Sequence, residues 1–335
     1  MFLSNLKRLG LALGLGAAML TSSVGLPGSV GRAADTVVRY AVDGFVLGTL
    51  IRVADAKGYF TEEGIDARLL TFSYGVDTVD AVLAGQADFG VIIDMPLLAR
   101  FSSGKLATPA FIGIPNPGWH KLYVSPDYTS IADLKGKKIA VASGTAQEFV
   151  TRIHLRDNGI DPDKDVELVG LASLFEIIGA MKSGRVDAAW IWGQGITELG
   201  DDPKFRFEAD DSIVNQKTIA LLVVAKDYLD NNRDTVLATL RALDKAAKDV
   251  ASDLDEAAAI VAKGIAGDAE KIKPVIQGQN YALSFEAAGM ASLKSKLDFL
   301  VASGVIDPAY DLNDYVDLEI LREAAPSVEV VDEIK

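Results

Sequence analysis

The sequence contains no cysteine and only two histidines, His120 and His154, among its 335 residues. Without cysteine the chain cannot form a disulfide, a thiolate zinc site, an iron–sulfur cluster or a cysteine nucleophile. Neither histidine has a nucleophile or carboxylate at a spacing that indicates catalysis. We therefore expect no cofactor, no metal site and no catalytic residue, with His154 on the surface and His120 within reach of a ligand.

The sequence also lacks a long apolar run at its start. The run LGLALGLGAAML, residues 9–20, is too short to span a bilayer. Two cationic residues precede it and a polar stretch ending in GRAAD follows, which is the pattern of a secretory signal peptide. We expect cleavage beside Ala33 or Ala34, which would remove residues 1–34; the alternative is an uncleaved membrane anchor. With no cysteine to carry a lipid, the mature protein should be free in the periplasm.

Positive charge is scarce, because 33 Lys and Arg stand against 47 Asp and Glu. Loss of residues 1–34 removes Lys7, Arg8 and Arg32 but no acid, which leaves 30 against 47 and a net charge of −17. Such a surface repels phosphate backbones and anionic lipid, so a nucleic-acid partner is not expected. The length and the 49% hydrophobic content predict a globular protein of two domains.

One pattern occurs twice. AVLAGQADFGVI (81–92) and AMKSGRVDAAWI (180–191) both read Ala-x-x-x-Gly-x-x-Asp and continue into an apolar segment. Upstream of each, a helix is predicted to end at Gly-Ile-Asp, and a short strand follows. Another strand precedes each unit, TVVRYAV (36–42) in the first and KKIAVAS (137–143) in the second. Strand–helix–strand–helix–strand is the half-unit of a doubly wound sheet, written here twice.

The sequence therefore predicts an α/β protein with two lobes, each a mostly parallel sheet with helices on both faces. The strands are apolar runs, as burial on both faces requires. Residues 118–134 and 217–229 read as strand-like connections that would form a two-strand hinge. We assign residues 35–125 together with the helical tail 226–335 to lobe 1, and residues 126–225 to lobe 2.

The expected ligand site is the edge of each sheet at which the parallel strands end. Ligands of open α/β sheets bind beyond the carboxyl ends of the strands, and two lobes on a hinge can close there on a solute. The residues in the loops at this edge are the candidates. The expected ligand-binding residues are Asp43, Gly44, Phe45, Tyr74, Asp94, Met95, Trp119, His120, Gly144, Thr145, Trp192, Gln194 and Asn215.

Two of these candidates are acids, Asp43 and Asp94, and each directly follows a predicted strand. At the ligand edge they could meet a cationic or N–H-rich solute. The alternative is that each caps the helix that follows, because carboxylate oxygens accept N–H bonds there. Capping is favoured for Asp94, which precedes Met95 and Pro96 at a helix start.

The segment SGTAQE, residues 143–148, predicts a helix start. Thr145 and Glu148 fit the T-x-x-E capping box. The alternative is that the backbone N–H groups of Gly144 and Thr145 stay open to an anion. Glu148 opposes that alternative because its carboxylate would already occupy the positive end of the helix.

Aromatic residues near the strand ends offer a pocket wall. Trp190 and Trp192 share one face of their strand. We expect Trp190 in the core, whereas Trp192 is followed by Gly-Gln-Gly and could form a wall with Phe45 and Trp119. Aromatic walls suit planar or methylene-bearing ligands.

The ordered set of motifs resembles a known family. After the signal peptide come KGYFTEEGID, AVLAGQADFGV, ADLKGKKIAVASGTA and SGRVDAAWIW. This order is similar to that of solute-binding proteins of ABC importers, in the group serving aliphatic sulfonates, taurine, nitrate and thiamine-precursor pyrimidines. The likeness covers about residues 36–230. It implies a type II periplasmic-binding-protein fold in a monomer that delivers solute to an ABC permease and ATPase at the inner membrane.

Carried over from the resemblance, the ligand contacts would fall on Gly44, Phe45, Asp94, Met95, Gly144, Thr145 and Trp192. Relatives often place an acid and a proline after this tryptophan, whereas Gly193 and Gln194 follow Trp192 here. An acid at Asp94 is also unexpected in a simple anion binder. Both departures favour an amine-bearing, zwitterionic or heterocyclic solute over a plain sulfonate or nitrate.

Two other functions fit the same fold. Enzymes of this fold make a thiamine pyrimidine or act on menaquinone precursors, so the fold alone does not exclude catalysis. Those enzymes are typically intracellular, and the pyrimidine-forming ones depend on cysteine and histidine. A ligand-sensing subunit for an envelope signalling partner would need the same two-lobed receptor.

Overall fold

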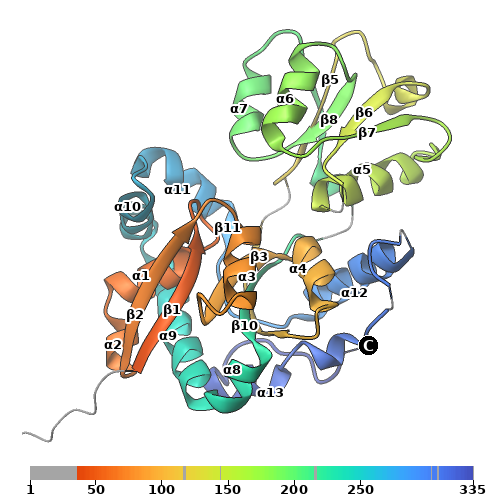
Figure 1. Cartoon of the computed structure of the whole chain (residues 1–335). Helices are drawn as coiled ribbons and strands as arrows, with labels where there is room; N and C mark the ends of the chain where they lie inside the picture. Colours follow the sequence, from red (N-terminus) through yellow and green to blue (C-terminus); the bar gives the residue numbers. More distant parts are fainter. Residues whose placement is uncertain are drawn as a thin grey trace, which may run out of the picture. The chain divides into compact units, whose positions relative to one another are not determined.

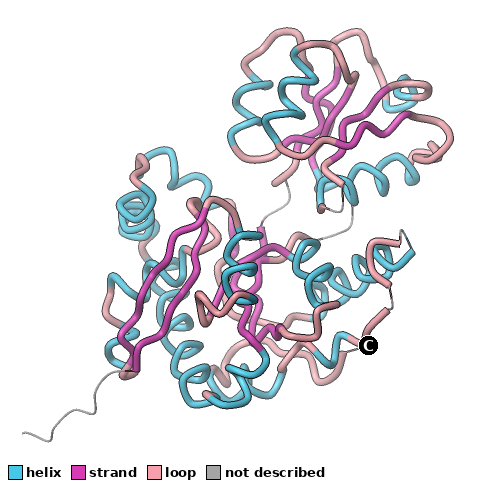
Figure 2. Tube along the Cα trace, in the orientation of Figure 1, coloured by secondary structure: helices cyan, strands magenta, loops and turns pink. Residues whose placement is uncertain are grey.

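The strands of the protein form two separate mixed sheets, seen in the computed structural model of Figures 1 and 2. The structure describes residues 36–115, 118–143, 145–214, 217–302, 304–307 and 309–334. The expected signal peptide, Gly144 and Asn215 therefore lie outside the described residues.

The first sheet has six strands in the order β11-β4-β10-β3-β1-β2. Strands β1, β2 and β3 run parallel, and β10 lies antiparallel between β3 and β4. The chain is buried along β10 and most of β1, whereas β2 at the edge is partly exposed. The bounds are β1 Thr36–Asp43, β2 Ile65–Phe72, β3 Phe89–Ile93, β4 Leu106–Pro115, β10 Ala220–Ala225 and β11 Gln279–Asn280.

The second sheet has five strands in the order β7-β6-β8-β5-β9. Strands β6, β7 and β8 are parallel, and β5 pairs antiparallel with both β8 and β9. The bounds are β5 Lys121–Val124, β6 Lys138–Val141, β7 Glu167–Gly170, β8 Ala188–Ile191 and β9 Arg206–Asp210. The two-lobed α/β prediction is thus confirmed, with an antiparallel strand in each sheet that the sequence pattern did not reveal.

Helices lie on both faces of each sheet. Along the strand order, the chain moves one way from β1 to β2 and the opposite way from β2 to β3. Because such crossovers are right-handed, the helices α1 and α3 that make them lie on opposite faces of the sheet. The same argument separates α5 from α6 around β6. The helices of these crossovers and of their neighbours are α1 Thr49–Ala56, α2 Tyr59–Glu62, α3 Gly75–Leu83, α4 Asp94–Phe101, α5 Ala146–Asp157, α6 Leu174–Lys182 and α7 Gln194–Gly200, with a 3-10 turn at Ile131–Leu134.

The tail after β10 is helical and packs on elements of the first sheet, as Figure 1 shows in blue-green and blue. Helix α9 contacts α1 and α2, α12 contacts α4, and α13 contacts β4. One face of α9 is an apolar stripe of Val236, Leu240, Leu243 and Ala247, and all four side chains are buried. The bounds are α8 Lys226–Asn231, α9 Arg233–Ser252, α10 Leu254–Ile265, α11 Ala269–Gln277, α12 Ala287–Ala302 and α13 Leu318–Ala324, with 3-10 turns at Asp211–Ile213 and Leu312–Asp314.

Two chain segments connect the sheets. One leads from β4 to β5, and the other leads from β9 through residues 211–219 to β10. Strand β5 pairs within the second sheet and β10 within the first. The expected lobe limits at residues 125 and 226 therefore place these two strands in the wrong sheets, because each crossing occurs before its strand and not after it.

The repeated motif makes the same local structure twice. Gly85 and Gly184 both have a positive φ, 69° and 71°, where glycine ends a helix without strain. The Asp88 carboxylate accepts the Arg39 N–H at 2.8 Å, and the Asp88 N–H donates to Arg39 O. In the second copy Asp187 makes the same reciprocal pair with Lys138. The motif's aspartate therefore fixes the register between the repeat's strand and its parallel neighbour.

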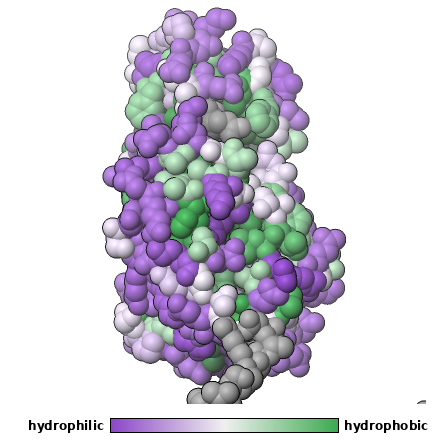
Figure 3. All heavy atoms as spheres, turned by 90° about the vertical axis from the view of Figure 1, so that its left-hand side faces the viewer, coloured by the Kyte–Doolittle hydropathy of each residue, from purple (hydrophilic) through white to green (hydrophobic). Residues whose placement is uncertain are grey.

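The face shown in Figure 3 is mostly hydrophilic, with apolar residues gathered near its middle. In the part of the chain that the structure describes, no helix combines the length and the apolar character that crossing a membrane requires.

We predict that Asp88→Ala lowers the free energy of unfolding by about 1–3 kcal/mol, because it leaves the partly buried Arg39 N–H without its acceptor. Urea denaturation measures the change. The control is Asp66→Ala, which removes an exposed pair with Arg68 and should cost less than about 0.5 kcal/mol. Equal losses in the two variants would contradict the role of the repeated aspartate.

Candidate functional site

The loops after β1 and β2 bring three expected ligand residues together at one sheet edge. The parallel register pairs Asp43 with Phe72, the last residues of the two strands. Phe45 and Tyr74 each lie two positions beyond that pair, so both loops leave the sheet side by side. Gly44 is exposed, Phe45 is 37% exposed and Tyr74 is 63% exposed. This edge therefore presents two aromatic rings to solvent.

Asp43 makes the contacts of the capping alternative. Its carboxylate accepts the Gly48 N–H at 2.8 Å and the Leu47 N–H at 3.3 Å, just ahead of α1. Arg52 donates to the backbone oxygen of Asp43 at 2.5 Å. Burial raises the pKa of the Asp43 carboxyl above its ordinary value, and the N–H groups of Gly48 and Leu47 oppose the rise. Both carboxylate oxygens therefore have partners within the protein.

Asp94 forms a buried ion pair with Lys296. It is 0% exposed, and its carboxylate lies 2.5 Å from the Lys296 ammonium group, which is 2% exposed. The same carboxylate accepts the Met95 N–H and the Ile219 N–H, each at 2.7 Å. Its charge is thus balanced inside the protein, which corrects the expectation that Asp94 faces the ligand. Met95 is likewise fully buried in the core instead of lining the site.

The helix start at Thr145 is confirmed, but the capping box is not. The Thr145 hydroxyl donates to Ala142 O at 2.6 Å and makes no capping hydrogen bond, and Glu148 pairs with Arg152 at 2.8 Å. The neighbouring Gln147 is buried. Its amide accepts the Ala142 N–H at 2.8 Å and donates to the oxygens of Ala140 and Trp190. Gln147 therefore joins the carboxyl ends of β6 and β8 to the first turn of α5.

Trp190 and Trp192 differ in exposure, as expected. Trp190 is buried in the core, whereas Trp192 is partly exposed just after β8. The ring of His120 contacts Trp192 edge-on, with 6.1 Å between centroids. Trp119 is also partly exposed. Gln194 begins α7 and so follows Trp192 at the same strand end.

His120 is not open to a solute, because it is buried against Asp211. The Asp211 carboxylate accepts the N–H groups of Gly118 and His120 at 2.5 and 3.0 Å, and it lies 3.0 Å from His120 Nδ1. Burial alone would raise the pKa of Asp211, but the hydrogen bonds from His120 and Gly118 hold it below its ordinary value. Asp211 thus ties the two segments that connect the sheets to each other.

Three functional positions were missed in the sequence: Lys296, Asp211 and Gln147. Lys296 and Asp211 act across 202 and 91 positions of sequence, where no periodicity links partners. Gln147 lies inside SGTAQE, and a signal was available there, since a polar side chain on the first turn of a helix after a buried strand has only backbone groups around it.

His154 corrects the expectation of a surface histidine. It is buried, and its ring meets Trp190 edge-on with 5.5 Å between centroids. Burial lowers the pKa of His154 below its ordinary value, and the nearby carboxylates of Asp157 and Glu208 oppose the decrease. The apolar core under α5 therefore holds this ring in its neutral form.

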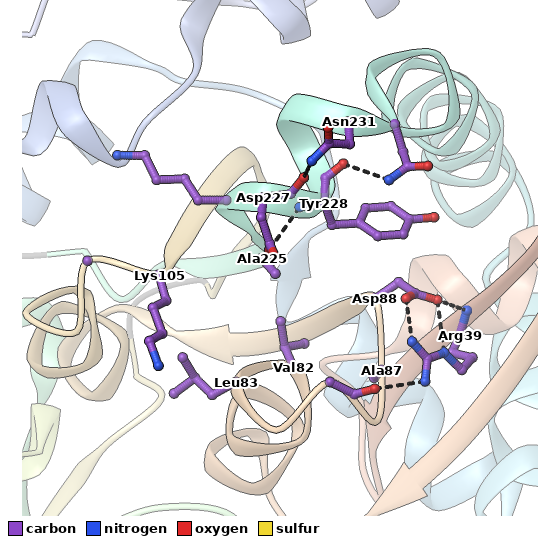
Figure 4. A pocket seen from close by; sticks show the side chains of 14 residues that line it. Arg39, Val82, Leu83, Ala87, Asp88, Lys105, Ala225, Asp227, Tyr228 and Asn231 are labelled. Atoms are coloured by element: carbon purple, nitrogen blue, oxygen red, sulfur yellow. Dashed lines mark hydrogen bonds and ion pairs between the residues drawn. The ribbon is translucent and has the colours of Figure 1, made fainter.

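A cavity of about 690 Å³ lies elsewhere, at the amino ends of β3 and β4. Figure 4 shows the Arg39–Asp88 pair on one side of it and Lys105 on the other, with Tyr228 between. Helices α3 and α4 end beside it, and the negative ends of helices favour these cations. The cations beside this cavity thus have a structural role. The cavity also lies away from the strand-end loops, so we do not assign the ligand to it. Among the described residues there is no group of three or more histidines and acids that could hold a metal ion.

Two mixed sheets with helices on both faces, linked by two crossings, define the fold of periplasmic binding proteins. The family model described as NMT1/THI5 like matches residues 48–257, and the chain belongs to this family.

The relatives are named as binding proteins and not as enzymes, in agreement with the prediction. A binding protein of Brucella abortus (strain 2308) is 26% identical over 278 residues, 80% of this chain and 85% of that protein. The taurine-binding periplasmic protein of Escherichia coli (strain K12) is 28% identical over 192 residues, 56% of this chain and 58% of that protein.

Solved structures show the same fold. The periplasmic aliphatic sulphonate binding protein SsuA from Escherichia coli has a TM-score of 0.71 at 19% identity, over 84% of this chain and 92% of that one. The periplasmic nitrate-binding protein NrtA from Synechocystis PCC 6803 has a TM-score of 0.68 at 16% identity, over 87% of this chain and 89% of that one.

We predict that Lys296→Met lowers the free energy of unfolding by about 3–5 kcal/mol, because Asp94 would keep a buried charge without its partner. Adding Asp94→Asn should restore part of the loss, since no uncompensated charge then remains. Urea denaturation of the single and double variants measures both effects. Lys294→Met, on an exposed position of the same helix, is the matched control and should change little. No recovery in the double variant would contradict the role of the pair.

His154 should make stability depend on pH. Because its pKa is lower in the folded than in the unfolded chain, its contribution is present above the unfolded pKa of about 6.5 and is lost as the pH falls toward the folded pKa. Unfolding at a series of pH values between 7 and 5 should show this loss in the wild type and not in His154→Phe. Identical pH profiles for the two proteins would show that burial does not perturb this ring.

Proposed function

We propose that the chain is the extracytoplasmic solute-binding protein of an ABC importer. It captures a small organic solute between its two lobes and delivers it to a permease and ATPase at the inner membrane. The observation that carries the proposal is that the strand-end loops of both sheets present partly exposed side chains, Phe45 and Tyr74 in one lobe and Trp192 in the other. Family membership and the names of the relatives support it.

The proposed route of closure uses the two connecting segments. Asp211 holds one end of both segments, and Asp94 with Lys296 holds the return segment where it enters the first sheet. Rotation would then be confined to the few residues between these anchors, as in hinge closure around a ligand. We propose lobe limits that follow the sheets, with the crossings before β5 and before β10.

The proposed solute is a small organic acid such as a sulfonate. One of the two departures that favour an amine-bearing or pyrimidine-type solute is Asp94, and Lys296 balances its charge internally. Relatives named for taurine, aliphatic sulphonates and nitrate favour an acidic solute for this chain. The exposed rings suit an organic body on that acid. The proposed location is the periplasm, reached through cleavage of residues 1–34.

A thermal-shift screen of residues 35–335 tests the proposal. Alkanesulfonates, taurine, nitrate, aromatic acids, simple amines and aminopyrimidines would each be added in excess. A solute at about a hundred times its Kd should stabilise the fold by roughly 2.7 kcal/mol. We expect stabilisation by one or more acids. Stabilisation confined to amines or aminopyrimidines would contradict the solute class, and none from any compound would contradict solute capture of this kind.

Tryptophan fluorescence should locate the solute, since the chain has three tryptophans and only two of them are partly exposed. We predict that binding of a hit changes the emission of the wild type and of Trp190→Phe, and that Trp192→Phe loses most of this change. The Trp190 variant is the control, because its ring lies in the core. An unchanged response in Trp192→Phe would place the solute away from the end of β8.

A further inference from the structure

Aromatic rings are exposed at particular places in this protein. Among the described residues, the exposed large aromatic side chains are Phe45, Tyr74, Phe175 and Phe207. The first three lie two, two and five residues beyond the ends of the parallel strands β1, β2 and β7, on the carboxyl side where ligands of such sheets bind. Only Phe207 lies within a strand, the edge strand β9. This distribution indicates that exposed aromatic rings are concentrated at the sheet edges where a ligand is expected.

Tyr74 and Phe175 lie at the starts of equivalent helices in the two copies of the repeat, although Tyr74 is the N-cap of its helix and Phe175 is the second helical residue. Tyr74 is the N-cap of α3, and its backbone N–H donates to the Asp77 carboxylate at 3.1 Å. In the second copy the N-cap of α6 is Ser173, whose hydroxyl accepts the Glu176 N–H at 3.2 Å, and Phe175 lies on the first turn. Tyr74 is 63% exposed and Phe175 is 57% exposed. Each lobe thus places one exposed ring at the start of its equivalent helix.

Each of these helix starts also touches the loop or turn that carries the second aromatic residue of its lobe. A Cβ added at Gly75, beside Tyr74, would lie 3.1 Å from Leu47 Cδ1, in the loop of Phe45. A Cβ added at Gly195, the second residue of α7, would lie 3.2 Å from the side-chain atom Cδ1 of Leu174, the residue before Phe175. The start of α3 therefore packs against the loop that carries Phe45, and the start of α6 packs against the start of α7, which follows Trp192.

We propose that Phe175 is a specificity-determining residue, and that it forms with Trp192 an aromatic wall opposed by the wall of Phe45 and Tyr74. A planar ring fits between two such walls, because aromatic rings gain from stacked and edge-to-face contacts beyond simple burial. The solute class is then an acid with an aromatic body. This inference rests on the proposed function and adds to it the shape of the solute and the residues that select it.

The test compares two sulfonates with the same acidic group, benzenesulfonate and ethanesulfonate, by calorimetric titration of residues 35–335. We expect benzenesulfonate to bind roughly tenfold more tightly, the equivalent of the best ring contacts. Phe175→Ala should remove most of this advantage and leave the affinity for ethanesulfonate unchanged. Phe207→Ala is the matched control, since it deletes an equally large ring, 47% exposed, from the same lobe.

Three results would overturn the inference: ethanesulfonate binding as tightly as benzenesulfonate, no binding of benzenesulfonate, or equal effects of Phe175→Ala and Phe207→Ala. Both positions are exposed, so loss of folding does not obscure the comparison, and thermal melting of each variant verifies this. If benzenesulfonate fails while another acid of the thermal-shift panel binds, solute capture stands and the aromatic specificity is wrong. If no compound of the panel binds, the proposed function itself fails.

Discussion

Two buried carboxylates hold the places where the chain passes between its sheets. Asp211 gathers the N–H groups of Gly118 and His120 on the second-lobe side. Asp94, paired with Lys296, receives the N–H of Ile219 on the first-lobe side, where Lys296 also donates to Lys217 O. A buried carboxylate is costly unless it is paired and hydrogen-bonded, and both of these are. The connection between the lobes depends on these two sites.

The Asp94 site also involves α12, a helix of the C-terminal tail. Lys296 lies on α12, and its ammonium group is 5.8 Å from the ring centroid of Phe149 on α5, whose ring meets Phe299 edge-on. One helix of the tail therefore contacts the first-lobe strand end, the return segment and a helix of the second sheet. The Asp94 carboxylate could have bound a cationic solute, but it pairs with Lys296 inside the protein. The Asp94 carboxylate is therefore not available to a solute, and this is one reason for proposing an acidic solute.

Much of this fold could be predicted because its signals are local. The Gly-x-x-Asp motif, the apolar strand runs and the helix start at Thr145 each act within one unit of the repeat, and the structure confirms the elements they predict. The place of β10 between β3 and β4 could not be predicted, because an antiparallel insertion reads as one more apolar strand. Within the candidate site the exposed aromatics Phe45 and Tyr74 were anticipated. The partners of Asp94 and His120 were not, since pairing across long sequence separations leaves no pattern in a single chain.

Small-angle X-ray scattering of residues 35–335, with and without a saturating solute identified by thermal shift, tests most directly the claim that the lobes close on a ligand. The account predicts a smaller radius of gyration when the solute is bound, since rotation about the two anchored segments brings the lobes together. A solute that binds while the radius of gyration stays the same would contradict closure and would leave the anchors a purely structural role.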